Sequence, residues 1–215
     1  MTKTHRTRAI AALATGLALA HAASAASIYD SGTPAATGFG LELSSIDWLA
    51  ADVNIAHATT IDAVSTFLTG ANAGETFTIA LYSDRTKNGA AIPDTRDGGE
   101  LYSTQVSFSA DGWNGATGLG WAVSAPGNYW FSIEVDDGDT LAASGAAALP
   151  VGAPNAPLGI AFTDGVAGRF QSLGSASAQY AFGLRVSTVP EPATPALLLA
   201  GIGLLGIAAQ RRARR

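Results

Sequence analysis

The sequence predicts an all-β protein: an antiparallel β-sandwich with jelly-roll-like connections, followed by a single C-terminal transmembrane helix. The 215 residues include 25 glycines and only 13% charged side chains, a composition typical of short strands joined by turns. Several segments alternate apolar and polar residues with the period of a half-buried strand. An uncharged run near the C-terminus predicts the helix. A closed barrel is the alternative to the sandwich, because alternation alone does not separate the two.

The segments between the two termini predict about eight to ten short strands. Residues 129–135 (YWFSIEV) carry the strongest pattern, and residues 76–83 (TFTIALYS) alternate strictly. Polar or small residues fill 84–100 and 142–156, which we expect to be loops. The other expected strands lie at 48–55, 59–68, 101–109, 120–124, 158–162 and 179–186. Together these strands define a β-sandwich ectodomain over residues 27–188.

The first 25 residues have the three parts of a Sec signal peptide. Three basic residues lie within the first eight, and residues 9–20 form an apolar run. Ala23 and Ala25 then supply the small-residue cleavage pattern. A membrane anchor is the alternative, but the run is too short to cross the hydrocarbon core comfortably. We therefore expect export through the Sec translocon and cleavage after Ala25.

Charge is distributed unevenly along the chain. Residues 27–189 contain five basic and 16 acidic side chains, a net charge of −11. We expect no nucleic-acid binding, because neutralising phosphates requires clustered Lys or Arg. Cysteine is absent, which excludes disulfides, thiolate metal sites and a cysteine nucleophile.

No residue pattern in the sequence predicts catalysis. His57 is the only histidine after the signal peptide, and no Gly-x-Ser-x-Gly motif accompanies it, so a serine triad is not expected. A glycosidase needs two acids facing one cleft, but no spacing singles out a pair. We predict a protein that is not an enzyme and that holds no cofactor.

The acidic residues provide only weak candidates for a metal site. Several of them precede glycine, as in Asp111-Gly112 and Asp137-Gly138, which is typical of turns. The densest oxygen donors are Asp136, Asp137 and Asp139, followed by Asp94, Asp97 and Glu100. Ca²⁺ prefers several oxygens on a flexible loop, but neither group has the EF-hand spacing. We predict no metal site and keep the first group as the weak calcium candidates.

Three aromatic residues are candidates for sugar binding. Tyr129 and Trp130 are neighbours on an expected strand, so their side chains point to opposite faces. Trp113 lies between glycines in an expected turn, where its ring would be exposed. Exposed aromatic rings provide stacking surfaces for sugars, whereas burial in the core is the commoner position of large aromatics.

The last 27 residues contain three features in a fixed order. A stiff polar motif comes first and consists of Val189, Pro190, Glu191 and Pro192. Residues 193–209 carry no charge and would form a helix of about 25 Å, close to the thickness of a hydrocarbon core. A basic stop follows and contains Arg211, Arg212, Arg214 and Arg215. The positive-inside rule keeps these arginines cytoplasmic, so the β domain would lie on the periplasmic side.

This tail resembles the PEP-CTERM sorting signal of Gram-negative bacteria, and Pro190-Glu191-Pro192 matches the name-giving motif without departure. The resemblance covers only the last 27 residues. It implies recognition by an exosortase, a membrane-bound cysteine protease-transpeptidase that cuts near the motif. Proteins with this signal are associated with extracellular polysaccharide and biofilm matrix.

Together these features predict an exosortase-sorted protein of the cell surface or extracellular matrix. It would be anchored transiently in the membrane and would have a structural or adhesive role, with extracellular polysaccharide as the expected partner. Two alternatives remain: a secreted polysaccharide hydrolase that uses a carboxylate pair, and a periplasmic protein held permanently in the inner membrane.

Overall fold

The computed structural model describes residues 26–34, 40–142, 144–147, 155–163, 165–173 and 182–188. These residues belong to one compact unit, Ala26–Val189. They form strands and no helix, and the strand pairs among them are antiparallel. The prediction of an all-β, antiparallel protein is therefore confirmed.

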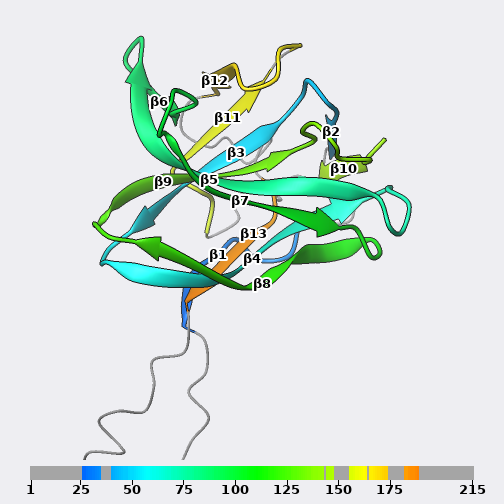
Figure 1. The fold of residues 1–215 in the computed structure, drawn as a ribbon, viewed down its shortest axis with the longest axis horizontal. Coiled ribbons are helices and arrows are strands. Elements are labelled where there is room, and N and C mark those ends of the chain that lie inside the picture. Colours follow the sequence, from blue (N-terminus) through cyan, green and yellow to red (C-terminus); the bar gives the residue numbers. More distant parts are fainter. Residues whose placement is uncertain are drawn as a thin grey trace, which may run out of the picture. The chain divides into compact units, whose positions relative to one another are not determined.

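The strands form two sheets (Figure 1). The first contains, in spatial order, β1 (Ser27–Asp30), β13 (Leu184–Thr188), β4 (Thr59–Thr69) and β8 (Gly112–Val123), with β10 (Ser144–Ala147) and β2 (Gly40–Leu43) at the end of β4. The second contains β12 (Phe170–Ser172), β11 (Gly159–Thr163), β3 (Leu49–Ile55), β9 (Gly127–Glu134), β5 (Thr76–Lys87) and β7 (Glu100–Ser107), with β6 (Ala90–Pro93) on the end of β5.

The main hydrophobic core lies between the two sheets. Phe77 of β5 and Phe131 of β9 meet side chains from the first sheet there. A register shift between Ile61 and Ala63 interrupts the alternation of β4. Because of this bulge, Ile61 and Val64 both enter the core although they are three residues apart.

A second, smaller hydrophobic cluster covers the opposite face of the second sheet. Its largest side chains are Trp48, Tyr82, Trp130 and Phe170. Tyr82 and Trp130 alternate along their strands with Leu81 and Phe131 of the main core, which places them on the outer face. Ile92 of β6 and Phe170 of β12 complete the cluster. These two strands lie at opposite ends of the second sheet and contact each other, so the sheet curls and its ends cover the cluster.

The structure corrects three expected boundaries. The expected loop 84–100 contains the end of β5 and all of β6, because Asn88 and Gly89 adopt φ values of 54° and 81° and form a two-residue hairpin turn. Trp113, expected in a turn, lies on β8, whose first residue is Gly112. The expected loop 142–156 contains β10, which pairs with β2 and β4 through small residues.

The signal peptide and the C-terminal helix predicted from the sequence lie outside the described residues. Within those residues, no helix has the length and apolar character needed to span a bilayer.

Candidate functional site

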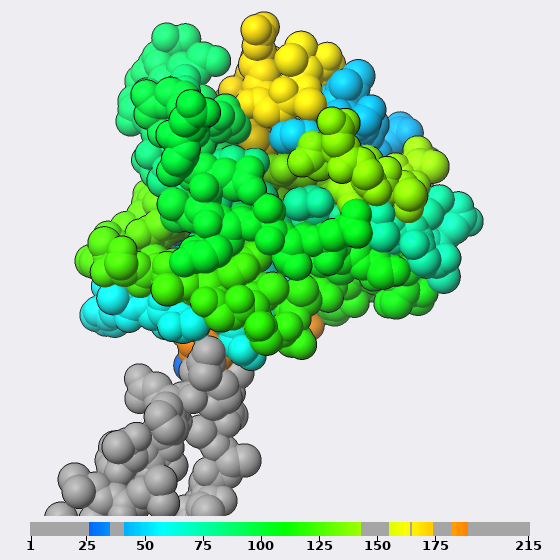
Figure 2. All heavy atoms as spheres, viewed as in Figure 1, coloured from blue at the N-terminus to red at the C-terminus, as the bar shows by residue number. Residues whose placement is uncertain are grey.

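A cleft of about 440 Å³ lies between the β5–β6 hairpin and the segment that connects β11 to β12. Figure 2 shows a notch between these two parts of the chain. The cleft is lined by Arg85, Lys87, Ile92, Thr95 and the residues from Val166 to Phe170. Its volume falls within the range of small-molecule sites, about 300–1,000 Å³.

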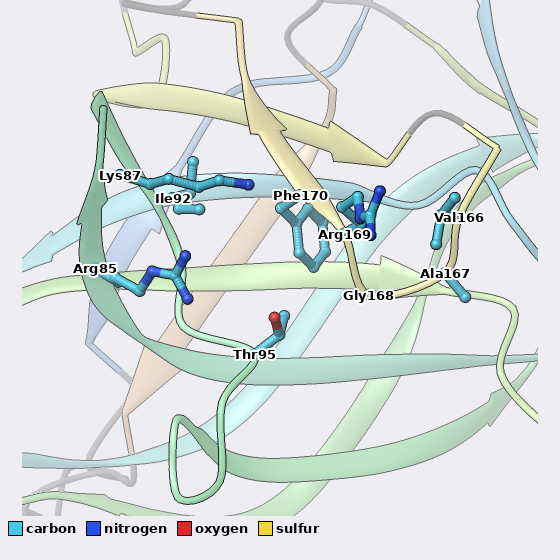
Figure 3. Close-up of a pocket in the computed structure, with 9 residues that line it drawn as sticks. All are labelled: Arg85, Lys87, Ile92, Thr95, Val166, Ala167, Gly168, Arg169 and Phe170. Carbon is cyan, nitrogen blue, oxygen red and sulfur yellow. The ribbon is translucent and has the colours of Figure 1, made fainter. Parts of the chain in front are cut away.

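Three positive charges distinguish this cleft from the rest of the acidic domain. Figure 3 shows Arg85 and Lys87 reaching from β5 toward Phe170, with Arg169 on the other side of the ring. The described lining residues contain no acidic side chain. Three of the five basic residues between 27 and 189 therefore gather at one place, on segments about 80 residues apart in the sequence.

The other two basic residues of the domain are both neutralised by carboxylates. Arg185 lies 3.2 Å from Asp30, and Arg96 lies 2.5 Å from Asp94. Lys87 and Arg169 make no ion pair with any described residue. The two unpaired cations of the described domain therefore both line the cleft.

Asp94 positions Arg85 and remains ionised. The Nε of Arg96 donates to Asp94 Oδ1 at 2.7 Å, whereas Arg85 Nη1 lies 3.8 Å from the same oxygen. Hydrogen bonding from Arg96 is the main cause that lowers the pKa of Asp94 to about 2. Because Asp94 lies closer to Arg96 than to Arg85, it offsets the positive potential of Arg85 only in part.

The base of the cleft is rigid and apolar. Phe170 is 2% exposed and packs against Trp48 and Tyr82, with ring centroids 6.3 and 6.1 Å away. The turn before it is closed by the backbone N–H of Arg169, which donates to the carbonyl of Val166 at 3.1 Å. Gly168 adopts φ 69° there, a conformation that favours glycine.

A second hollow of about 230 Å³ adjoins the cleft along the hairpin. It shares Lys87, Ile92 and Phe170 with the cleft and also contacts Asn88 and Gln171. The two hollows thus meet at Lys87, and together they form a groove in which charge lies near an apolar base.

Two of the aromatic residues proposed for sugar binding lie on opposite faces of β9, as the alternation predicts. Trp130 is 0% exposed in the outer cluster, and its Nε1 donates to Asp84 at 2.7 Å. Tyr129 is half-buried and packs against the main core, and its hydroxyl donates to the carbonyl of Ala125 at 2.9 Å. Trp130 therefore offers no free ring face in this structure.

Trp113 is half-buried on β8 and its ring already has two partners. Phe67 meets it edge to face at 5.6 Å, and the guanidinium of Arg185 lies 3.8 Å from the ring centroid. This cation–π contact occupies the position that a stacked sugar would take. Arg185 is in turn held by Asp30.

Two of the three weak calcium candidates, Asp136 and Asp139, accept backbone hydrogen bonds within the turn after β9. Asp139 Oδ2 accepts hydrogen bonds from the Thr78 hydroxyl at 2.9 Å and from the backbone N–H of Asp136 at 3.0 Å. Asp139 Oδ1 accepts from Gln105 at 2.9 Å. Within the described residues, no group of three acidic or histidine side chains is arranged to hold a metal ion.

Two buried acids, Asp52 and Glu134, lie on the outer face of the second sheet and are not predicted from the sequence. Burial raises the pKa of Asp52 to about 6 and that of Glu134 to about 7. Asp52 pairs with Trp130 across the strands, so four residues of β9, about 13 Å, separate it from Glu134. That separation exceeds the spacing of about 5–9.5 Å found in glycosidases. His57 is exposed between β3 and β4.

Comparison with known protein families gives a match in the C-terminal tail. Residues 188–215 match the description "PEP-CTERM protein-sorting motif". The chain carries a PEP-CTERM sorting signal. This confirms the resemblance inferred from Pro190-Glu191-Pro192 and supports an exported protein that an exosortase sorts to the surface or the exterior. No curated protein and no solved structure matches the chain.

The residues assigned to processing lie outside the described part of the chain. They are Ala23 and Ala25 at the expected signal cleavage site, the motif Val189, Pro190, Glu191 and Pro192, and the basic stop Arg211, Arg212, Arg214 and Arg215.

Proposed function

We propose that this chain is a structural or adhesive protein of the cell surface or extracellular matrix, associated with extracellular polysaccharide. The match of residues 188–215 to the PEP-CTERM motif carries the proposal. In this account the tail anchors the exported chain in the inner membrane only until an exosortase cuts near Pro190-Glu191-Pro192. The ectodomain is then the working part of the molecule.

We further propose that the ectodomain is a jelly-roll β-sandwich. The strand orders β1-β13-β4-β8 and β3-β9-β5-β7 support this. Along these eight strands the chain changes sheet at every step except from β5 to β7, as in two interlocked Greek keys. Such a fold supplies a rigid platform for binding but does not by itself define a function.

The buried acids argue against the hydrolase alternative. Asp52 and Glu134 are the described acids whose pKa values burial raises, as a general acid requires. Both are buried, Asp52 at 4% and Glu134 at 2% exposure, so neither can reach the oxygen of a glycosidic bond. We therefore propose a binding or structural role rather than catalysis.

Cell fractionation with immunoblotting tests the sorting proposal. We expect the wild-type protein at the cell surface or in the medium. The double variant Pro190→Ala/Pro192→Ala should stay in the inner membrane, because the motif that the exosortase recognises is lost. Pro126→Ala, at an exposed turn of the domain, is the matched control and should sort normally. Wild-type protein confined to the inner membrane would instead support permanent anchoring.

A further inference from the structure

We propose that the cleft formed by Arg85, Lys87 and Arg169 binds the carboxylate groups of an acidic polysaccharide. This site goes beyond the sorting signal, and its choice of ligand rests on the proposed matrix location. The observation behind it is that both unpaired cations of the described domain face one cleft with an apolar base.

Lys87 and Arg169 are exposed cations that are free to meet an anion from solvent. Residues 27–189 carry 16 acidic side chains, yet Lys87 and Arg169 are held apart from all those that the structure describes. Arg85 lies 3.8 Å from Asp94, and its side chain is 24% exposed. An arrangement of three cations around one hollow creates a positive potential that an anion would satisfy.

The shape of the site favours an anion on an extended chain over a free ion. The cleft and the adjoining hollow share Lys87, Ile92 and Phe170, so a ligand can pass from one to the other. Phe170 and Ile92 are only 2% and 4% exposed, so ligand recognition falls to the charged side chains that line the two hollows. Arginine guanidinium groups match planar carboxylates through paired hydrogen bonds, and Thr95 adds a hydroxyl.

Charge disfavours a nucleic acid as the occupant. A nucleic acid carries a phosphate at every nucleotide and needs a long basic track, whereas this domain offers three cations within a net charge of −11. The acidic surface beyond the cleft would repel a densely charged polymer. A polysaccharide with spaced carboxylates presents fewer charges to that surface.

Binding of a hyaluronan oligosaccharide, in which every second sugar carries a carboxylate, by the full-length chain, purified in detergent, tests the proposal. The control ligand is the same oligosaccharide with its carboxylates methyl-esterified. We expect the ester to bind at least about tenfold more weakly, because it lacks the charges that the cleft recognises. Equal affinity for both forms would overturn the proposal, and this comparison needs no variant.

Variants then locate the site. Lys87→Gln and Arg169→Gln should each weaken binding about threefold to tenfold, since each removes one exposed charge contact. Arg185→Gln removes a cation that faces Trp113 and should leave affinity unchanged. A loss of binding confined to Arg185→Gln would overturn the assignment. Thermal midpoints of all three variants check that the fold is retained.

Competitors distinguish the sources of negative charge. Inorganic phosphate and a single-stranded DNA oligonucleotide should displace the oligosaccharide only at much higher concentration. Displacement by phosphate or by DNA at equal concentration would contradict an acidic-sugar site. Sorting is measured separately by fractionation, so loss of sugar binding with normal sorting would refute this inference and leave the proposed export intact.

Discussion

Glu134 makes the stability of this domain depend on pH in a direction that can be measured. Its side chain is 2% exposed, and its Oε1 has no hydrogen-bond partner among the described residues. Burial raises its pKa from an ordinary 4.5 to about 7, although the neighbouring Ser132 and Tyr82 hydroxyls oppose the rise. Glutamine has nearly the same shape and cannot ionise, so Glu134→Gln isolates this effect.

The magnitude follows from the difference between the folded and unfolded pKa. Between pH 4.5 and pH 7 the unfolded chain releases the Glu134 proton while the folded chain retains it, so wild-type stability falls as the pH rises. A shift from 4.5 to about 7 corresponds to about 3 kcal/mol. Glu134→Gln should therefore gain about 3 kcal/mol relative to wild type on going from pH 4 to pH 8.

Urea unfolding of both proteins at pH 4 and pH 8 measures this difference. Glu75→Gln is the control with the opposite sign, because hydrogen bonds from Asn72 lower the pKa of Glu75. That variant should lose stability relative to wild type as the pH rises. A difference between Glu134→Gln and wild type that is the same at both pH values would refute the reasoning.

Three further changes test other parts of the structure. Trp130→Phe removes the hydrogen-bond donor to Asp84 from a fully buried position. In urea unfolding it should lower the unfolding free energy by about 2 kcal/mol, and unchanged stability would contradict the buried position. Gly115→Ala should lower the unfolding free energy by about 1–3 kcal/mol or more in the same assay, because the added Cβ would collide with the backbone of Val64 and Ser65. A neutral effect would contradict this close approach of the two strands. The thermal midpoint should be the same in calcium as in chelator, because both carboxylate oxygens of Asp139 already accept hydrogen bonds, from Thr78 and Gln105. A midpoint that is higher in calcium than in chelator would show a metal site.

Local patterns in the sequence predict much of the sheet structure. Alternation identifies the long strands and places Tyr129 and Trp130 on opposite faces. The hairpin at Asn88-Gly89 does carry a local signal, since an Asn-Gly pair is typical of two-residue turns, although residues 84–100 as a whole have the polar composition of a loop. The strand β10 (Ser144–Ala147) has no such signal, because its small residues gain their structure from pairing with β2 and β4.

The cleft depends on contacts that are remote in the sequence. The spacing of Arg85 and Lys87 places them on one side of a strand, but nothing local indicates that Arg169 joins them. Its position follows from the pairing of β11 with β3 and β12. The burial of Trp130 has the same cause, since β6 and β12 cover a sheet face that alternation alone would leave open to solvent.

Intact mass spectrometry of the protein recovered from outside the cell tests the central claim of export and processing most directly. The account predicts a chain that begins after Ala25 and ends near Pro190-Glu191-Pro192, without the basic stop. An extracellular chain that still carries residues 193–215 would contradict removal of the tail by an exosortase.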